Sequence, residues 1–424
     1  MSFAGKYLKR HSIYHPQINE SPANDLQIIV VIPCYNEPDI LKTLNCLIAC
    51  EMPPTPVEVL VVINSGEGDK EEIIVQNKKT ENEIKAWSDF KANEKIKTFV
   101  IHKNNLSRKH AGAGLARKIG MDEAIHRFNK INKPNGIIVS FDADSLCSPN
   151  YLSEIYQQFR KRPKATACSI YFEHPVLGKE FSPEIYRAVT RYELYMRFYN
   201  QALRYTGYPY SFHTVGSCFA VRASVYAAQG GMNRKQAGED FYFLQKVIPL
   251  GGFFEINETC VFPSPRPSDR VCFGTGSMVN SLVKSDIDFK TYPVKIFSDL
   301  LHFFSDIKQL YAQSDNAAGR YILQQSNILQ EFLLNNFFIE NIAEINANSA
   351  DRKNFVKRFF RWFNAFRILK YANYACENEY QKESLIEVAN QLGRETGILK
   401  KENSEAEVLL SFYRRFEKEN QNET

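Results

Sequence analysis

The chain has 424 residues, with 53 Lys and Arg against 48 Asp and Glu, which gives a formal net charge of +5. A hydrophobic fraction of 44% and a charged fraction of 24% are typical of globular proteins and exclude wholesale disorder. A charge of +5 spread over this length argues against a dedicated nucleic-acid-binding protein.

Short runs rich in β-branched residues predict four strands in the first 145 residues. Each run is largely apolar rather than alternating, as expected of strands covered on both faces. The predicted strands are Gln27–Ile32, Val57–Ile63, Lys97–Ile101 and Gly136–Phe141, and the predicted helices between them are Glu37–Cys50, Asp69–Phe90 and Gly112–Phe128. This alternation predicts an α/β fold with a mostly parallel sheet, whose functional groups lie beyond the carboxyl ends of the strands.

The rest of the chain has a different pattern. A segment rich in Tyr and Arg is followed by a strand, a loop, a helix that begins at Glu239 and a further strand, and the sequence from about Ile287 is mostly helical. We predict an N-terminal extension at 1–26, an α/β domain at 27–285, a helical C-terminal domain at 286–417 and a polar tail at 418–424.

Polar residues follow the first two predicted strands. The first strand runs into Pro-Cys-Tyr-Asn-Glu-Pro, where Tyr35 and Glu37 could hold a nucleotide base and ribose, although a strand-to-helix turn with a capping Asn36 also explains the motif. After the second strand, Asn64 could bond to the edge of a base. A glycine-rich loop before the next helix is an equally good explanation of that segment.

Two acidic pairs stand out further along the chain. Asp142 and Asp144 follow a buried strand and could bind a hard divalent cation shared with a diphosphate, although many Asp-x-Asp motifs are simply turns. Glu239 and Asp240 open a helix, where the helix dipole favours acids in any case. A carboxylate in that position could also accept a proton from an attacking hydroxyl group.

Taken together and in this order, the motifs resemble those of the family 2 glycosyltransferases with the GT-A fold, in particular a bacterial-type soluble member. The residues that carry the resemblance are IIVVIPCYNEPDILKTL, VSFDADS and GGMNRKQAGEDFYFLQKV. They cover roughly residues 27–276, and the C-terminal third matches no pattern that we can assign. The resemblance implies transfer of a sugar from a nucleotide-diphosphate donor to an acceptor hydroxyl, non-processive and presumed to invert the anomeric centre.

The resemblance also implies roles for particular residues. Asp142 and Asp144 would hold Mg²⁺ or Mn²⁺ against the donor diphosphate, and Asp142 would also contact the nucleotide sugar. Asp240 would be the catalytic base, and Glu239 would orient the base or the acceptor. The residues implied for the nucleoside pocket are Pro33, Tyr35, Glu37 and Asn64.

The sequence departs from the family pattern in two places. Many relatives carry two adjacent acids after the second strand, where this chain has Ile63 and Asn64. Similar folds often supply a His metal ligand after the strand that follows the acidic pair, whereas residues 260–267 contain none. The metal would then be held by the Asp-x-Asp motif alone, or with help from Ser264 or Asp269.

A glycine-containing segment at residues 111–117 follows the third strand rather than the first, and no suitable acid follows it, so we reject a dinucleotide-binding motif. In a glycosyltransferase, Lys109 and Arg117 beside this segment would contact the donor phosphates. Close packing of a helix on the sheet with solvated cations is an equal alternative.

Aromatic residues make up 13% of the chain, and six tyrosines crowd residues 192–210. Their rings could stack on an acceptor sugar, with Tyr210 and His213 as candidate acceptor contacts, but spacings of three and four residues fit a buried helix face better. The acceptor itself could be a glycan, a lipid-linked molecule or a small molecule.

Residues 352–370 contain seven basic residues, no acidic residue and six aromatic residues, five of them at near-helical spacing. They could form an interfacial helix at a membrane that bears the acceptor, although a core helix is the first explanation. No apolar run is long enough to span a bilayer, the first seventeen residues lack the apolar core of a signal peptide, and nine scattered cysteines favour reduced thiols. We therefore expect a cytoplasmic protein, at most peripheral to the inner membrane face.

Two alternatives to a glycosyltransferase stay open. A nucleotidyltransferase also combines an α/β sheet with an acid-bound metal, but it would normally show a glycine-rich basic loop after the first strand. A catalytically silent scaffold that binds nucleotides or sugars would bind a nucleoside diphosphate but never release one from a nucleotide sugar.

Overall fold

The computed structural model describes residues 2–91, 95–235, 238–268, 274–284 and 289–421. The chain divides into two compact units. The first consists of Met1–Val189, Thr214–Val283 and Glu417–Thr424, and the second of Thr190–His213 and Lys284–Phe416. Residues 190–213, which were predicted as part of the α/β domain, group with the second unit, and the domain boundaries stay a prediction.

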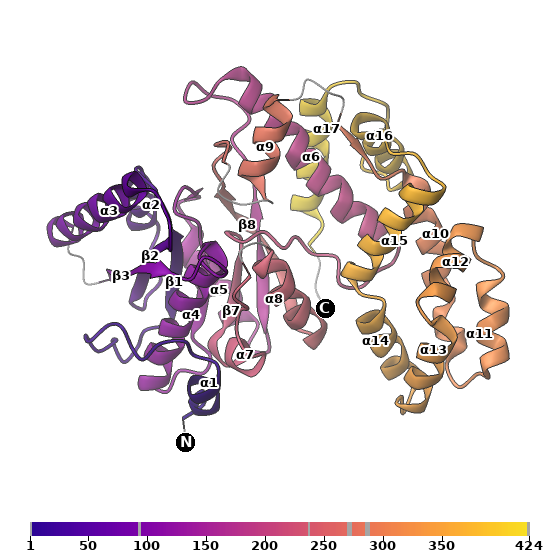
Figure 1. Ribbon diagram of the computed structural model, residues 1–424, viewed down its shortest axis with the longest axis horizontal. Coiled ribbons are helices and arrows are strands. Elements are labelled where there is room, and N and C mark those ends of the chain that lie inside the picture. The colour runs from indigo at the N-terminus through magenta and orange to yellow at the C-terminus, as the bar shows by residue number, and fades with distance from the viewer. Residues whose placement is uncertain (1, 92–94, 236–237, 269–273, 285–288, 422–424) are drawn as a thin grey trace. The chain divides into compact units, whose positions relative to one another are not determined.

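An eight-stranded sheet forms the centre of the first unit (Figure 1), in the order β3-β2-β1-β4-β7-β6-β8-β5. The strands are β1 (Ile28–Cys34), β2 (Val57–Gly66), β3 (Ile96–Leu106), β4 (Ile137–Ser140), β5 (Leu146–Cys147), β6 (Ala167–Phe172), β7 (Phe219–Arg222) and β8 (Phe253–Phe262). The neighbours among β1 to β4 are parallel, and so are β6 and β8, whereas β7 is antiparallel to β4 and β6, and β5 to β8. The predicted α/β fold with a mostly parallel sheet is confirmed.

Helices cover both faces of the sheet, which explains why β1 and β2 are mostly apolar and are buried along their whole length. In Figure 1, α2 and α3 lie on one side of β1 to β3, and α1 and α4 lie on the other. The helices of this unit are α1 (Gly5–Arg10), α2 (Ile40–Ile48), α3 (Glu71–Phe90), α4 (Ala113–Lys130), α5 (Tyr151–Lys161), α7 (Ala223–Ala228), α8 (Glu239–Val247) and α9 (Thr275–Lys284), with a short 3₁₀ turn, η1 (Ile248–Leu250). A Cβ at Gly120 of α4 would lie 2.4 Å from Val31 Cγ1, so glycine is needed for this helix to pack on β1.

The N-terminal extension packs on α4. The hydroxyl of Tyr7 donates a hydrogen bond to Asp122 over 2.5 Å, and the backbone N–H of Gln17 donates to Glu123 over 2.7 Å. Lys118 also bonds to the Tyr7 hydroxyl and to Asp122 inside the same buried network. The extension is therefore an ordered layer of the first unit.

Three thiols meet between α2 and β5. The Sγ atom of Cys147 lies 3.7 Å from that of Cys46 and 3.6 Å from that of Cys50. The hydrogen bond from Cys147 lowers the pKa of the half-buried Cys46 to about 6, although burial opposes this effect. All eight cysteines that the structure describes are free thiols, and Cys272 lies outside the described residues.

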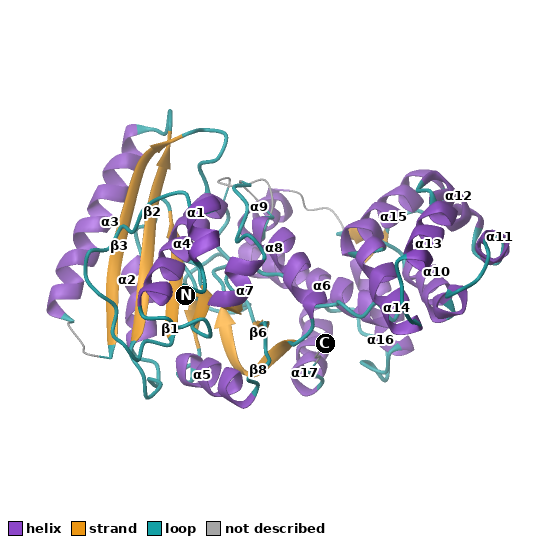
Figure 2. Cartoon of the chain, turned by 90° about the horizontal axis from the view of Figure 1, so that it is seen from below, coloured by secondary structure: helices purple, strands orange, loops and turns teal. Residues whose placement is uncertain are grey.

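The second unit is helical (Figure 2). The long helix α6 (Pro183–Tyr205) begins in the first unit and ends in the second, and α17 (Ala406–Glu419) begins in the second and ends in the first. The other elements are β9 (Lys290–Thr291), α10 (Val294–Ser305), the 3₁₀ turn η2 (Ile307–Leu310), α11 (Asp315–Ile322), α12 (Asn327–Asn335), α13 (Phe338–Ala347), α14 (Arg352–Trp362), α15 (Ala365–Asn378), β10 (Glu383–Ser384) and α16 (Leu385–Glu395).

Phenylalanine rings fill the core of the second unit. Phe303 and Phe304 of α10 pack against Phe359 and Phe363, with ring centroids 5.3 to 6.1 Å apart. The aromatic face of residues 352–363 is therefore buried in this core, as the first explanation of that segment predicted.

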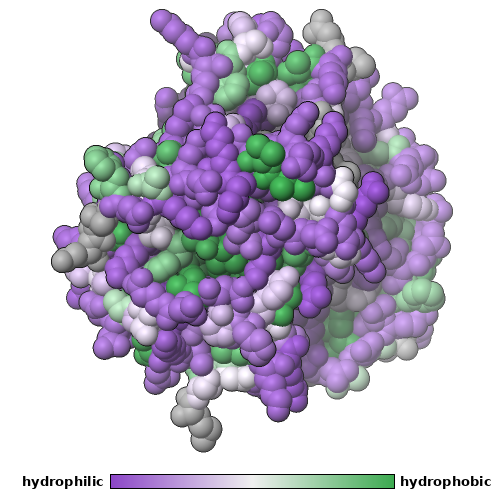
Figure 3. Space-filling model, turned by 60° about the vertical axis from the view of Figure 1, so that its left-hand side comes forward, coloured by the Kyte–Doolittle hydropathy of each residue, from purple (hydrophilic) through white to green (hydrophobic). Residues whose placement is uncertain are grey.

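Among the described residues, no helix combines the length and the apolar character needed to cross a bilayer. The face shown in Figure 3 is mostly hydrophilic, and its hydrophobic residues gather in small separate patches.

Candidate functional site

The loops after β1, β2 and β4 lie side by side at one edge of the sheet. Because β1 is parallel to both β2 and β4, the carboxyl ends of the three strands point the same way. The strand ends and the loops after them carry Glu37, Asn64, Asp142 and Asp144, all of which were predicted to line the site.

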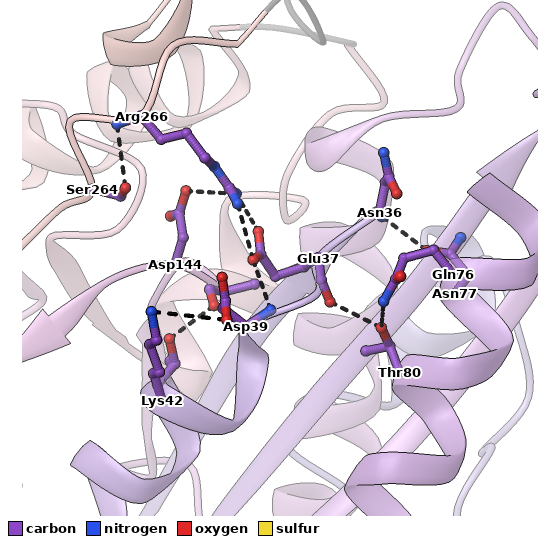
Figure 4. A network of polar contacts seen from close by, with 12 residues as sticks. Asn36, Glu37, Asp39, Lys42, Gln76, Asn77, Thr80, Asp144, Ser264 and Arg266 are labelled. Atoms are coloured by element: carbon purple, nitrogen blue, oxygen red, sulfur yellow. Dashed lines mark hydrogen bonds and ion pairs between the residues drawn. The ribbon is translucent and has the colours of Figure 1, made fainter. Parts of the chain in front are cut away.

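The guanidinium of Arg266, in the turn after β8, pairs with two of these acids. Glu37 is buried, and it accepts hydrogen bonds from both terminal nitrogens of Arg266. Nη2 of Arg266 also lies 3.3 Å from Asp144 Oδ2, and Figure 4 shows Arg266 pointing toward both acids. Burial lowers the pKa of Arg266, but the bonds and charges of Glu37 and Asp144 outweigh this effect and raise it.

Pro33 and Tyr35 lie at the end of β1 and in the loop after it, respectively. Pro33 is buried within the strand, and Tyr35 is half-buried. Asn36 adopts a positive φ of 48°, a conformation that Asn tolerates, and its backbone N–H donates to Asn77 Oδ1 of α3 over 2.8 Å. Since α2 begins only at Ile40, the expectation that Asn36 caps this helix is wrong.

Asn64 lies deep at the end of β2, with 1% of its surface exposed. Its Nδ2 donates a long hydrogen bond of 3.4 Å to the carbonyl of Gly112, and its own carbonyl accepts from Asn77 Nδ2. Among the described residues, no group donates to Asn64 Oδ1. A buried acceptor without a donor is unfavourable, so this oxygen is suited to a ligand N–H.

Arg117 of α4 holds a second cluster of acids. Its Nη2 donates to Asp142 Oδ1 over 2.6 Å, and its Nη1 bonds to Glu239 Oε1. Arg117 and Glu239 are both about 5% exposed, whereas the side chain of Asp142 is 38% exposed. Burial lowers the pKa of Arg117, but the charges of Asp142, Glu239 and Asp240 outweigh this effect and raise it.

Asp240 stands next to Glu239 in the first turn of α8 and is half-buried. Burial and the charges of Glu239 and Asp142 raise the pKa of Asp240 to about 7, although Arg117 and the backbone N–H of Phe241 oppose the rise. A carboxyl group with a pKa near neutral pH is suited to accept and release a proton.

Gly216 lies under this second cluster. A Cβ at Gly216 would lie 2.9 Å from both Arg117 Nη2 and Asp240 Oδ2. Because glycine has no side chain, Arg117 and Asp240 can both lie close to the backbone at this position. Its carbonyl accepts a 2.6 Å hydrogen bond from Ser140 Oγ, which ties the segment to the end of β4.

Three further predicted site residues belong to other segments of the chain. Lys109 is exposed in the loop before α4. Tyr210 and His213 belong to the second unit, in which the Tyr210 ring packs 5.7 Å from that of Tyr208. The tyrosines of α6 stack along the helix and pack on Phe289, Tyr292 and Phe297 of the same unit, which favours the structural explanation of that segment.

Two carboxylates offer oxygen ligands for a cation. Asp142 and Asp144 are at least one-third exposed, and each makes an ion pair with an arginine. Among the described residues, no group of three or more His, Cys, Asp or Glu side chains is arranged to hold a metal ion. Ser264 Oγ instead accepts from the Arg266 backbone, and Asp269 lies outside the described residues. These residues fit Mg²⁺ or Mn²⁺ only if phosphate oxygens and water complete the coordination.

Two contributors to the site were not predicted as site residues. Arg266 was covered only as part of residues 260–267, which were considered for a His ligand, and Asn77 lies on a helix with no motif around it. One signal could have identified Arg266, namely that it is the first basic residue after a buried strand. No local signal marks Asn77, because its role depends on contacts with Asn36 and Asn64.

Comparison with known proteins identifies one family. Residues 29–229 match the model of glycosyl transferase family 2. No curated protein matches the sequence significantly. Among solved structures, TarS 1–349 of S. aureus in complex with UDP-GlcNAc is 14% identical, with a TM-score of 0.42, covering 81% of this chain and 93% of that chain. The mannosyltransferase PcManGT of Pyrobaculum calidifontis, in complex with GDP-Man and Mn²⁺, is 14% identical, with a TM-score of 0.34, covering 85% and 93%.

Proposed function

We propose that this chain, in which residues 29–229 form a glycosyl transferase family 2 domain, transfers a sugar from a nucleoside diphosphate donor to an acceptor hydroxyl with inversion at the anomeric carbon. The observation that carries the proposal is the convergence of Asp142, Glu239 and Asp240 on Arg117 at the carboxyl edge of the sheet. Three acids around one buried cation form a charged centre at the edge where α/β sheets bind their ligands.

The nucleoside is proposed to bind between the loops after β1 and β2. The buried Oδ1 of Asn64 can accept a hydrogen bond from an N–H group at the edge of the base. Pro33, Tyr35 and Glu37 form the other wall, and Arg266 can reach a phosphate from its position beside Glu37. Lys109 is proposed to contact the phosphates from the loop before α4.

A divalent cation, Mg²⁺ or Mn²⁺, would be held by Asp142 and Asp144 together with the donor diphosphate. When bound, it would neutralise charge on the departing diphosphate. Because both carboxylates make ion pairs with arginines in this structure, Arg117 and Arg266 would share or yield these ligands when the donor and the cation enter.

Asp240 is proposed to be the base. It accepts the proton of the acceptor hydroxyl, whose oxygen forms a bond to the anomeric carbon. The bond from that carbon to the phosphate oxygen breaks, and its electron pair leaves with the nucleoside diphosphate. A pKa of about 7 allows Asp240 to be ionised before the reaction and to hold the proton after it. Glu239 and Arg117 position Asp240, and Tyr210 and His213 stay predicted acceptor contacts.

A panel of nucleotide sugars tests the proposal, with release of nucleoside diphosphate as the readout. We expect one donor to be consumed, and we expect Asp240→Asn to bind it with unchanged affinity but to lose transfer. Asp39→Asn is the matched control, because Asp39 is a 58% exposed carboxylate near the same edge. Release of pyrophosphate would indicate a nucleotidyltransferase instead, and binding without any release would indicate a scaffold.

A further inference from the structure

The outward side of α14 carries basic side chains and no acidic ones. Lys353, Arg358 and Arg361 are exposed, whereas Phe355 and Phe359 are buried in the core of the second unit. Because the aromatic face of α14 is occupied, this helix cannot lie on a membrane by inserting that face. Any apolar contribution to an interaction must come from neighbouring elements.

Neighbouring turns supply exposed apolar side chains. Leu334 is 55% exposed, Phe337 is 66% exposed and Phe366 is 40% exposed. The rings of Phe338 and Trp362 lie 6.0 Å apart, and this contact brings the turn between α12 and α13 beside the turn between α14 and α15. Leu334 lies at the end of α12, Phe337 lies in the turn that follows it, and Phe366 lies at the start of α15, so all three flank these two turns of the second unit.

Phe337 also has an unusual backbone conformation. Its φ of 56° lies in the left-handed region, which is strained for a large aromatic residue and which Asn or Gly adopts more readily. The ring does not compensate for this strain by packing, since most of it is exposed. Strain retained in an exposed aromatic residue is typical of a site that meets a partner.

Cations lie next to these rings. The Arg367 guanidinium lies 4.1 Å from the centroid of the Trp362 ring, and Lys370 Nζ lies 5.0 Å from that of Phe366. Exposed acids of the same unit include Glu340 of α13 and Glu331 of α12, and Glu331 accepts a 2.5 Å hydrogen bond from the Tyr374 hydroxyl. The excess of basic side chains comes from α14 and α15, since residues 352–370 contain seven Lys and Arg and no Asp or Glu.

We propose that this surface, formed by Leu334, Phe337 and Phe366 with the basic side chains of α14 and α15, binds the interface of a bilayer that contains anionic lipids. The exposed side chains would enter the boundary between headgroups and acyl chains, and the cations would pair with lipid phosphates. We call it the α12–α15 patch. The proposal is independent of the proposed function, because every residue of the patch lies in the second unit.

Flotation of the full chain with vesicles tests the proposal. We expect binding to vesicles of phosphatidylcholine with phosphatidylglycerol, none to phosphatidylcholine alone, and loss of binding at high salt. Arg361→Gln with Lys370→Gln should lower the partition coefficient about 25-fold, since each charge near the surface contributes about 5-fold. The matched control is Arg160→Gln, an exposed cation on α5 of the first unit, which should change nothing.

A second pair of substitutions tests the rings. Phe337→Asn with Phe366→Ser should lower the partition coefficient about 10-fold or more. Because Asn adopts a positive φ readily, Phe337→Asn alone should melt at the same or a higher temperature than the unmodified chain, so that weaker binding cannot be ascribed to misfolding. Phe90→Ser is the control, since Phe90 is 81% exposed in the first unit.

Three results would overturn the proposal. The first is equal binding to vesicles with and without phosphatidylglycerol. The second is binding by the ring and charge variants that equals that of the two controls. The third is binding of a short RNA without binding of anionic vesicles, which would assign the basic stripe of α14 to nucleic acid.

Discussion

Replacing Asp240 by Asn removes a carboxylate from a position where its charge is unfavourable. Burial and the charges of Glu239 and Asp142 raise the pKa of Asp240 from 3.8 to about 7. The folded protein therefore holds this proton more tightly than the unfolded chain does, so stability is lost as the pH rises from about 4 to about 7. Because Asn carries no charge, the variant should not lose this stability.

The two pKa values of Asp240 set the size of the effect. Each tenfold difference in proton affinity between the folded and unfolded states is worth about 1.4 kcal/mol. With a pKa of 3.8 in the unfolded chain and about 7 in the folded protein, the raised pKa costs about 2 kcal/mol of stability at pH 5 and about 4 kcal/mol at pH 8. The stability of Asp240→Asn relative to the unmodified chain should therefore increase by about 2 to 3 kcal/mol between these pH values.

Urea denaturation at pH 5 and pH 8 measures this difference. The chain contains two tryptophans, Trp87 in the first unit and Trp362 in the second, so a Trp362→Phe background reports on the unit that contains Asp240. Asp39→Asn in the same background is the control, because it removes an exposed carboxylate from the same unit. A stability difference for Asp240→Asn that is equal at the two pH values, or larger at pH 5, would refute the reasoning.

Three further outcomes are expected. The kcat/KM of transfer should rise with pH through about 7, because Asp240 must lose its proton to act as the base. Glu239→Gln should move the midpoint of this rise to lower pH, because it removes a negative charge that repels the Asp240 carboxylate. A midpoint that does not move contradicts this prediction. Arg266→Ala should lower the free energy of unfolding by about 2 kcal/mol, because the buried Glu37 carboxylate loses its ion pair with the guanidinium. Urea denaturation that finds no loss at pH 8 argues against the pair. Asn64→Leu should leave the free energy of unfolding equal or higher, because a buried oxygen without a donor is removed. The same variant should bind nucleoside diphosphate about tenfold more weakly in calorimetry. Undiminished binding would exclude contact between Asn64 and the base.

The sheet could be predicted because its signal is local. The sequence segments that form β1 and β2 are apolar at almost every position. This pattern is expected of strands that are covered on both faces of the sheet. Asp142 follows such a run directly, so the parallel topology was enough to predict its place at the carboxyl edge. The predicted boundaries differ from the observed ones mainly at the strand ends. β2 continues to Gly66 and β3 to Leu106, through polar residues that the sequence analysis left outside the strands.

The ion pairs could not be predicted because their partners are far apart in the sequence. Glu37 and Arg266 are separated by 229 positions, and Arg117 and Glu239 by 122. Nothing in the composition near Arg266 indicates which acid it will meet, since the pairing depends on where β8 ends relative to β1 and β4. The grouping of residues 190–213 with the second unit could not be predicted either. Helix α6 is continuous across the boundary between the two units, so the sequence carries no local signal of that boundary.

The three thiols between α2 and β5 give the protein a chemical reporter of its own. A half-buried thiol with a pKa of about 6 is mostly thiolate at neutral pH, and it should react with iodoacetamide faster than its buried neighbours. Cys46 lies on the helix that follows Glu37, and its partner Cys147 lies three residues after Asp144. If ligand binding moves the loops that carry Glu37 and Asp144, the rate of alkylation at Cys46 should change, and this rate can be measured before any substrate is known.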